Sequence, residues 1–272
     1  MELFSGKTVV ISGGAEGIGF AVAQAVGREG MNVVITDIST ETLAHAQASL
    51  SDQGITVLAL TADVRKEADW QRVVEATIAQ FGAIHGLMNN AGVGGGGSSG
   101  PIEEHSAEDW RWTIDVNLMG VVFGMKTVVP HIKAAGGGWI VNVASMAGMS
   151  GFPFGGAYNA TKLAVAGLSE GWAMELAPFG IQVAALCPAF VKTRIHLSDR
   201  VGPRTMVTPS VTSYFLKKIS TLRPHLPGSP TRSKMVSIRT SSLCVLLSHC
   251  GRVTSISSHT PRTARSANSV TQ

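Results

Sequence analysis

Short runs of aliphatic and β-branched residues alternate with longer segments of helical pattern over residues 7–200, and this alternation limits the fold more than any other feature. We expect strands at residues 7–12, 32–36, 55–61, 84–89, 139–144 and 181–186. These runs are almost continuously apolar, which is typical of parallel strands covered by helices on both faces. The pattern therefore predicts an α/β fold in three layers, α/β/α, around a doubly wound parallel sheet.

Composition narrows the class of protein further. A chain of 272 residues with 44% hydrophobic content can bury the core of one large α/β domain. Its cysteines, Cys187, Cys244 and Cys250, cannot all pair and lack metal-ligand spacing, so we expect a reducing compartment, no disulfide framework and no metal site. Neither a secretory signal nor a membrane-spanning stretch is visible, and we therefore expect a cytoplasmic protein without a membrane partner.

Charged residues divide the chain near residue 200. All eighteen Asp and Glu residues lie within residues 1–200 beside twelve Lys and Arg, whereas residues 201–272 hold ten Lys and Arg and no acid. Ser and Thr number 23 in the first 200 residues and 24 in the last 72. We therefore expect two units, a globular domain over 1–200 and an atypical, basic, Ser/Thr-rich segment over 201–272.

A glycine-rich turn follows the first expected strand and opens a helix. Gly13 permits a tight turn, Gly17 lets the backbone approach a pyrophosphate, and Gly19 lets the helix pack closely against the strand. The free N–H groups of the helix N-terminus would face the phosphates. The turn thus predicts a dinucleotide site, with a purely structural turn as the alternative, and its candidate residues are Gly13, Gly14, Glu16, Gly17, Ile18 and Gly19.

Asp37 ends the second expected strand, eighteen residues after Gly19. A carboxylate at this position can accept hydrogen bonds from both ribose hydroxyls of an adenosine, and it would repel a 2′-phosphate. Glu16 adds to that repulsion, and no Lys or Arg sits beside either acid in the sequence. We therefore expect NAD(H) as the cofactor rather than NADP(H).

Tyr158 and Lys162 lie four residues apart after the fifth expected strand, so a helix would place both on one face. A phenol has a pKa of about 10 and is a poor base at neutral pH. An ammonium group about 4 Å away, at an effective dielectric near 20, would lower that pKa by about three units. The pair is therefore a candidate acid/base. Ser145, at the end of the fifth strand, could hold a substrate oxygen or simply cap a turn.

Taken together, these motifs resemble the short-chain dehydrogenases/reductases over residues 5–194. The matching set is Gly13-x-x-x-Gly17-x-Gly19, Asn89-Asn90-Ala91-Gly92, Asn117, Ser145 and Tyr158-x-x-x-Lys162. The resemblance implies a Rossmann-like fold in which residues 1–200 form an NAD(P)-binding catalytic domain.

The resemblance also implies catalytic roles. Tyr158 would be the acid/base, and Lys162 would lower the phenol pKa and hold the nicotinamide ribose. Ser145 would position and polarise the substrate oxygen. Asn117 would kink its helix and anchor a water in the proton relay.

Further cofactor contacts follow from the same resemblance. Asp63 and Val64 correspond to an adenine-binding pair, and Asn90 meets the cofactor after the fourth strand. Val191 belongs to a turn that contacts the nicotinamide amide, in which Ala189 replaces the usual glycine.

The implied function is an NAD(H)-dependent oxidation of a secondary alcohol, or reduction of the matching ketone. Met146, Met149, Phe152, Phe154 and the loop 94–100 lie where relatives form the substrate pocket, which suggests an apolar or ring-bearing small molecule; the aromatic and methionine side chains could equally fill the core, and the loop could be a plain linker. A catalytically weak or inactive NAD(H)-binding relative, or a sensor, is the alternative.

Residues 201–272 depart from what the family resemblance implies, which is a substrate lid, a helix and a last strand. Three interpretations compete: a basic disordered extension, a divergent lid, and a reading-frame change near residue 200, which we favour. No aromatic–basic interleaving is present, so we expect no nucleic-acid partner. The apolar run 243–247 could still form a last strand. If the segment folds, we expect a homo-oligomer, a dimer or tetramer.

Overall fold

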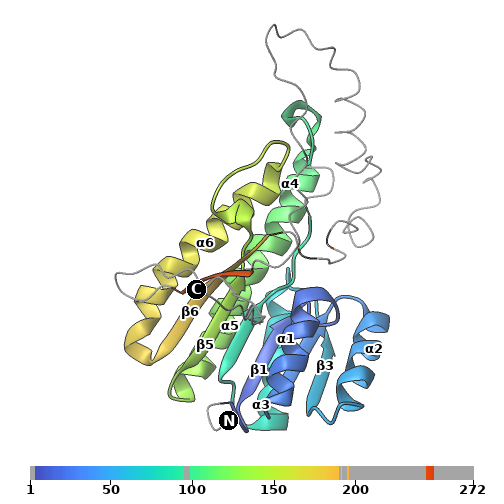
Figure 1. Cartoon of the computed structure of the whole chain (residues 1–272), viewed down its shortest axis with the longest axis vertical. Helices are drawn as coiled ribbons and strands as arrows, with labels where there is room; N and C mark the ends of the chain where they lie inside the picture. The colour runs from blue at the N-terminus through green and yellow to red at the C-terminus, as the bar shows by residue number, and fades with distance from the viewer. Residues whose placement is uncertain (1–3, 95–98, 190, 192–194, 196–242, 248–272) are drawn as a thin grey trace, which may run out of the picture.

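Six parallel strands form the centre of the computed structural model, which describes residues 4–94, 99–189, 191, 195 and 243–247 (Figure 1). The strands are β1 (Thr8–Ser12), β2 (Asn32–Asp37), β3 (Val57–Thr61), β4 (Gly86–Asn89), β5 (Gly138–Val143) and β6 (Ile181–Pro188). The sheet order is β3-β2-β1-β4-β5-β6-β7, so the direction of winding reverses between β1 and β4. Parallel neighbours on both sides of that reversal confirm the predicted doubly wound, Rossmann-like sheet.

A seventh strand, β7 (Leu243–Leu247), pairs with β6 and forms the edge of the sheet. It coincides with the apolar run that could form a last strand. Its pairing is antiparallel, so the sheet is not parallel throughout. The three interpretations offered for the rest of residues 201–272 concern a part of the chain outside the described residues.

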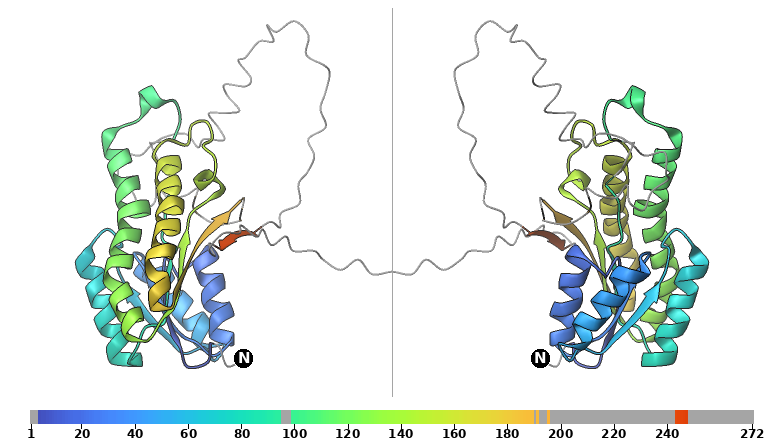
Figure 2. Two further views of the ribbon diagram at one scale, coloured as in Figure 1. Left: turned by 90° about the vertical axis from the view of Figure 1, so that its left-hand side faces the viewer. Right: turned by 90° about the vertical axis from the view of Figure 1, so that its right-hand side faces the viewer.

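Helices cover both faces of the sheet (Figure 2). One face is covered by α1 (Gly17–Arg28) and α2 (Thr40–Ser51), and the other by α3 (Glu67–Phe81), α5 (Gly120–Ala134) and α6 (Gly156–Leu176). Side chains alternate along each strand, so Val9 and Ile11 join the core under α1 and α2 while Val10 faces α3 and α5. Burial on both faces explains why the strand sequences are continuously apolar.

The long helix between β4 and β5 contains one wide turn. It begins as α4 (Ala107–Ile114), where Ser106 caps it by accepting a hydrogen bond from the Asp109 backbone N–H, and it continues through a π-helical turn over Asp115–Met119 into α5. Residues 107–134 are long and apolar enough to cross a membrane, although the sequence analysis found no such span. Val128 and Ile132 are fully buried against the sheet, and 44% of the apolar window is buried inside the structure.

Shortening a core side chain of α5 should destabilise the fold strongly. Ile132 is fully buried, and replacing it with alanine removes apolar contacts and leaves a cavity, so Ile132→Ala should lower the free energy of unfolding by about 2–5 kcal/mol. Ile102 undergoes the same chemical change at a side chain that is 69% exposed, and Ile102→Ala should cost less than about 0.5 kcal/mol. Urea unfolding of both variants measures the difference, and equal losses would contradict the assigned core.

Candidate active site

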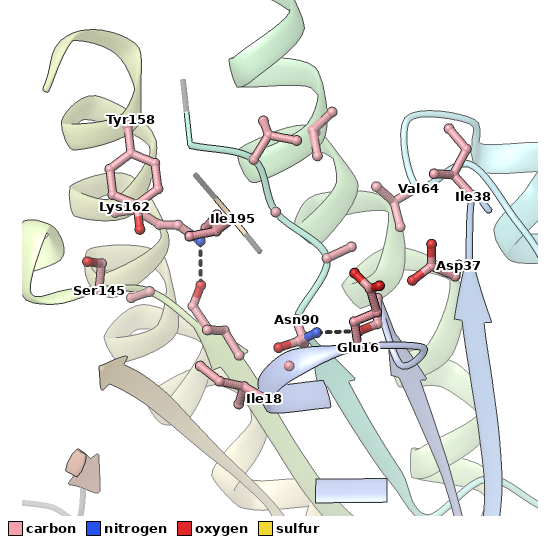
Figure 3. A pocket seen from close by; sticks show the side chains of 18 of the residues that line it. Glu16, Ile18, Asp37, Ile38, Val64, Asn90, Ser145, Tyr158, Lys162 and Ile195 are labelled. Atoms are coloured by element: carbon pink, nitrogen blue, oxygen red, sulfur yellow. Dashed lines mark hydrogen bonds between the residues drawn. The ribbon is translucent and has the colours of Figure 1, made fainter. Parts of the chain in front are cut away.

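A cleft of about 260 Å³ opens at the carboxyl ends of the parallel strands, where the winding of the sheet reverses (Figure 3). Most of the residues singled out from the sequence line it together. They are Gly13, Glu16, Gly17, Ile18, Asp37, Asp63, Val64, Asn90, Ser145, Tyr158, Lys162 and Val191. Gly14, Gly19 and Asn117 do not line the cleft, and the structure places each of them behind its wall.

The glycine-rich turn between β1 and α1 forms the floor of the cleft. Gly13 and Gly17 have φ angles of 61° and 58°, which side-chain-bearing residues rarely adopt. The Asn90 side chain fastens this turn by donating from Nδ2 to the carbonyl oxygens of Gly13 at 2.8 Å and Ser12 at 3.0 Å. The N-cap Glu16 side chain does not cap α1, so the first N–H groups of the helix are left for a ligand.

Gly14 and Gly19 serve the packing of this turn rather than the surface of the cleft. A Cβ at Gly14 would lie 2.7 Å from the Ile35 side chain of β2. A Cβ at Gly19 would collide with the Gly13 carbonyl oxygen and the Asn90 amide. Only glycine at both positions lets the turn lie this close to the sheet, which leaves a cradle of backbone open toward the cleft.

The carboxylates of Asp37 and Glu16 lie near each other at one end of the cleft. Asp37 ends β2 and accepts a hydrogen bond from the Ser39 backbone N–H at 3.2 Å. Burial raises the pKa of Asp37; backbone N–H groups, among them that of Ser39, act against it, and the nearby charge of Glu16 raises it further. The two carboxylates make this end of the cleft unfavourable for a further negative charge.

Arg65 lines the same end of the cleft, although sequence reasoning found no cation there. Its guanidinium binds both oxygens of the Asp63 carboxylate, with a shortest distance of 2.7 Å from Nη2 to Oδ2. Burial alone would raise the pKa of Asp63, but hydrogen bonds from the Arg65 side chain and backbone outweigh it and lower that pKa. A pair two residues apart on a loop has no regular spacing, so only the folded loop reveals it.

Ser145, Tyr158 and Lys162 meet at the opposite end of the cleft (Figure 3). Ser145 follows β5 and accepts a hydrogen bond from the Ala147 backbone N–H at 3.1 Å, so it caps a turn and also faces the cleft. Tyr158 and Lys162 lie on the first turns of α6. Lys162 is buried, and its Nζ donates to the Val143 carbonyl oxygen at 2.8 Å.

The expected lowering of the Tyr158 pKa by Lys162 is wrong for this arrangement. Burial raises the pKa of Tyr158. A hydrogen bond with Ser145 lowers that pKa, but its effect is smaller than that of burial. The Lys162 Nζ lies 5.7 Å from the centre of the Tyr158 ring, and it donates to the Val143 carbonyl oxygen. Burial also lowers the pKa of Lys162 to about 8, because a charged ammonium loses its hydration there.

Asn117 lies in the π-helical turn between α4 and α5, which agrees with the expected irregularity of its helix. Its side chain is fully buried and holds the backbone of Val93: Nδ2 donates to the Val93 carbonyl oxygen at 2.9 Å, and Oδ1 accepts from the Val93 N–H at 2.8 Å. Nδ2 also lies 3.4 Å from the Thr161 Oγ1 of α6. Asn117 therefore ties three elements together behind the catalytic end of the cleft.

Described residues of the turn after β6 line the cleft, although Ala189 replaces the glycine usual in the family. Pro188, Ala189 and Val191 line the cleft. Among the described residues other than glycine, only Phe154 has a positive φ, 62°. Ala189 therefore carries none of the steric cost that a left-handed backbone would impose.

Exposed apolar side chains follow Ser145 in the chain, and one of them lies beside Tyr158. Met146, Met149 and Phe152 are each about half-exposed, and the Phe152 ring centre lies 6.5 Å from that of Tyr158. Phe152 also borders a depression of about 450 Å³ between the loops that hold Gly100 and Phe154. The Gly100 backbone N–H donates to the Phe154 carbonyl oxygen at 3.1 Å and joins these loops. Residues 95–98 of the loop expected to border the pocket lie outside the described residues.

Removing the buried amine of Lys162 should stabilise the protein at neutral pH. A folded-state pKa of about 8, against an ordinary 10.5, means that the charged form destabilises the fold below pH 8 by about 3 kcal/mol. The hydrogen bond to Val143 returns about 1 kcal/mol. Lys162→Met should therefore raise the free energy of unfolding by about 2 kcal/mol at pH 7.

The pH dependence of this gain provides the check. Between pH 8 and 10.5 the unfolded wild-type chain holds more protons at this site than the folded one, so wild-type stability rises and the gain should shrink. Denaturant unfolding of both proteins across this range measures it, with Lys66→Met, at an exposed lysine, as the control. A gain that does not change with pH would show that the buried charge is not its cause.

Comparisons with known proteins agree with this geometry. The short chain dehydrogenase family model matches residues 7–201. The 3-alpha-(or 20-beta)-hydroxysteroid dehydrogenase of Mycobacterium bovis is 39% identical over 188 residues, 69% of this chain and 70% of that protein. Cyclohexanol dehydrogenase of Acinetobacter sp. is 38% identical over 190 residues, 70% and 75% of the two chains. A crystal structure of a short chain dehydrogenase/reductase from Burkholderia phymatum in complex with NAD has a TM-score of 0.74 at 35% identity and covers 82% of both chains. This chain therefore belongs to the short-chain dehydrogenase family of oxidoreductases.

Proposed function

We propose that this protein is an NAD(H)-dependent oxidoreductase that interconverts a secondary alcohol and the matching ketone. The observation that carries the proposal is the arrangement of one continuous cleft. The glycine-rich turn and Asp37 lie at one end of it, and Ser145, Tyr158 and Lys162 lie at the other. A ligand that spans the cleft would have its adenosine end at Asp37 and its reacting end at Tyr158.

The residues present fit a nicotinamide dinucleotide. The backbone cradle at Gly13 and Gly17, which a Cβ would fill or strain, leaves room for a pyrophosphate at the start of α1. Asp37 would bind the adenosine ribose, Asp63 and Val64 the adenine, and Lys162 and Val191 the nicotinamide half. The bound cofactor would supply or accept the hydride, and all proton handling would be left to the protein's side chains.

Tyr158 would handle the proton of the substrate oxygen, and Ser145 would hold that oxygen in place. Because burial raises its pKa, the Tyr158 phenol is protonated at neutral pH and can donate to a carbonyl oxygen. The Ser145 hydroxyl is already turned into the same end of the cleft. In the reverse direction a phenolate is required, so we expect alcohol oxidation to be favoured at alkaline pH.

The substrate class follows from the mouth of the cleft. We infer an apolar, ring-bearing alcohol or ketone, because the half-exposed Phe152 lies beside Tyr158 and the half-exposed Met146 and Met149 belong to the same segment after Ser145. The relatives named for hydroxysteroids and cyclohexanol support this inference.

We propose NAD(H) over NADP(H) because of charge. Asp37 and Glu16 together would repel a 2′-phosphate, and the positive charge of the Arg65 that lines the same end is balanced by its ion pair with Asp63. We also propose a cytoplasmic catalytic domain over residues 1–200 that acts as a homo-oligomer on a small-molecule substrate.

A second candidate function is NAD(H) binding without turnover. It is favoured by one observation: the Lys162 Nζ is engaged by Val143 and the Tyr158 pKa is raised, so this arrangement does not contain an activated phenolate. Turnover with apolar secondary alcohols would exclude this alternative.

Tyr158→Phe tests the assignment of the acid/base. The variant keeps the ring and loses the proton, so turnover should fall by a factor of about 10² to 10⁴. NADH affinity should stay within about twofold, because the phenol hydroxyl contributes little to binding of the whole dinucleotide. Absorbance assays of NAD⁺ reduction and fluorescence titration with NADH measure the two effects. Near-normal turnover would mean that another group moves the proton.

Asp37→Ser tests the basis of cofactor choice. Removing the carboxylate relieves repulsion of a 2′-phosphate and deletes an acceptor for the ribose hydroxyls, so the ratio of NADH to NADPH affinity should fall by about tenfold or more. Asp52→Ser, at the exposed end of α2 and outside the cleft lining, is the control. An unchanged ratio, measured by fluorescence titration with both cofactors, would reject the charge argument.

A further inference from the structure

Arg65 is a charged cleft residue to which the proposed function assigns no role. It lies two residues after Asp63 on the loop between β3 and α3, at the end of the cleft that also holds Asp37 and Val64. Tyr158 lies at the other end. A guanidinium at this place would be far from the proton transfer and close to the base of a bound dinucleotide.

The Arg65 side chain is held rigidly by Asp63. Nε donates to Oδ1 at 2.9 Å and to Oδ2 at 3.1 Å, and Nη2 donates to Oδ2 at 2.7 Å. The Arg65 backbone N–H also donates to Oδ1 at 3.1 Å. A two-point contact between planar groups fixes their orientation, which a single lysine ammonium could not do.

The loop beneath this pair is anchored as well. The Asp63 backbone N–H donates to the Asp69 Oδ2 at 2.8 Å, which ties the end of β3 to the first turn of α3. The Asp63 side chain is 11% exposed and that of Arg65 is 37% exposed. Asp63 therefore forms the base of the loop, and Arg65 forms its rim.

The rim still has hydrogen-bond donors to offer. A guanidinium carries five N–H groups, and those on Nε and Nη2 point at Asp63. The hydrogen bonds that the Arg65 guanidinium makes to described residues run from Nε and Nη2 to Asp63, which leaves Nη1, and Asp115 lies close enough to interact with Arg65 electrostatically. The apolar residues Ile38, Ala62 and Val116 line the same cleft. Apolar walls with a guanidinium at the rim and a carboxylate beneath it suit an aromatic base that has ring-nitrogen acceptors and an amino donor.

We propose that Arg65 is a cofactor-positioning residue, which holds the Asp63 carboxylate in place and contacts the purine base of the dinucleotide. This inference rests on the proposed function, because it takes the cofactor to lie in this cleft. It assigns to Arg65 a share of the affinity for the adenosine half and none of the affinity for the nicotinamide half.

Arg65→Ala tests the proposal through three probes that share different parts of the cofactor. Isothermal titration calorimetry would measure binding of NADH, ADP-ribose and reduced nicotinamide mononucleotide to wild type and variant. NADH and ADP-ribose should each bind about tenfold more weakly, while the mononucleotide should bind unchanged. Arg65→Lys should weaken binding of NADH and ADP-ribose almost as much as Arg65→Ala does, because an ammonium cannot reproduce the two-point contact.

Arg72→Ala is the matched control. Arg72 also pairs with an aspartate, Asp69, at 2.8 Å, but it is more exposed and does not line the cleft. Its replacement should leave all three affinities unchanged. Losses for NADH and ADP-ribose within twofold of this control, or an equal loss for the mononucleotide, would overturn the proposal. Failure of wild type to bind NADH would instead reject the proposed function.

Discussion

The cleft depends on a clamp between the ends of β1 and β4, the two neighbouring strands between which the winding of the sheet reverses. Four hydrogen bonds form it: the Ser12 Oγ accepts from the backbone N–H groups of Asn90 and Ala91, and the Asn90 side chain donates to the carbonyl oxygens of Ser12 and Gly13. Chains leave these strands in opposite directions along the sheet, so a crevice must open between them. The clamp sets its floor, and every other cleft residue is placed relative to that floor.

At the end of this crevice that holds Tyr158 and Lys162, buried polar groups lower the stability of the fold. Lys162 borders the cleft but is only 3% exposed, and burial opposes charge on both Lys162 and Tyr158. The fold tolerates the buried amine because Val143 accepts its hydrogen bond and because Asn117 and Thr161 brace the neighbouring backbone. Polar groups that are costly to bury and yet held in place at a cleft are the mark of a functional site rather than of a core.

The adenosine end uses charge in a different way. Asp37 and Glu16 set a negative potential at this end, where we propose that the adenosine ribose binds, while Asp63 and Arg65 neutralise each other one strand further along. Repulsion of a phosphate and recognition of a neutral base can therefore operate within one short stretch of the cleft. Asp37 and Tyr158 lie at opposite ends of the cleft, so probes that carry half of the proposed cofactor can separate the contributions of the two ends.

Local patterns in the sequence were enough to determine the parallel strands and most of the residues that line the cleft. The apolar runs identified the six parallel strands, and the spacings around Gly13, Ser145 and Tyr158 identified the cleft residues, because a parallel sheet brings all strand ends to one edge. The direction of the last strand, the side-chain contacts behind the cleft and the pKa shifts were decided only by the tertiary structure. The antiparallel β7, the use of Asn117 to hold Val93 and the raised Tyr158 pKa arise from contacts between distant segments or from burial, and the Arg65–Asp63 pair arises from the conformation of one loop. Residue spacing encodes none of these properties, because strand pairing depends on which segments meet in the fold and a pKa shift depends on how much water the surrounding chain excludes.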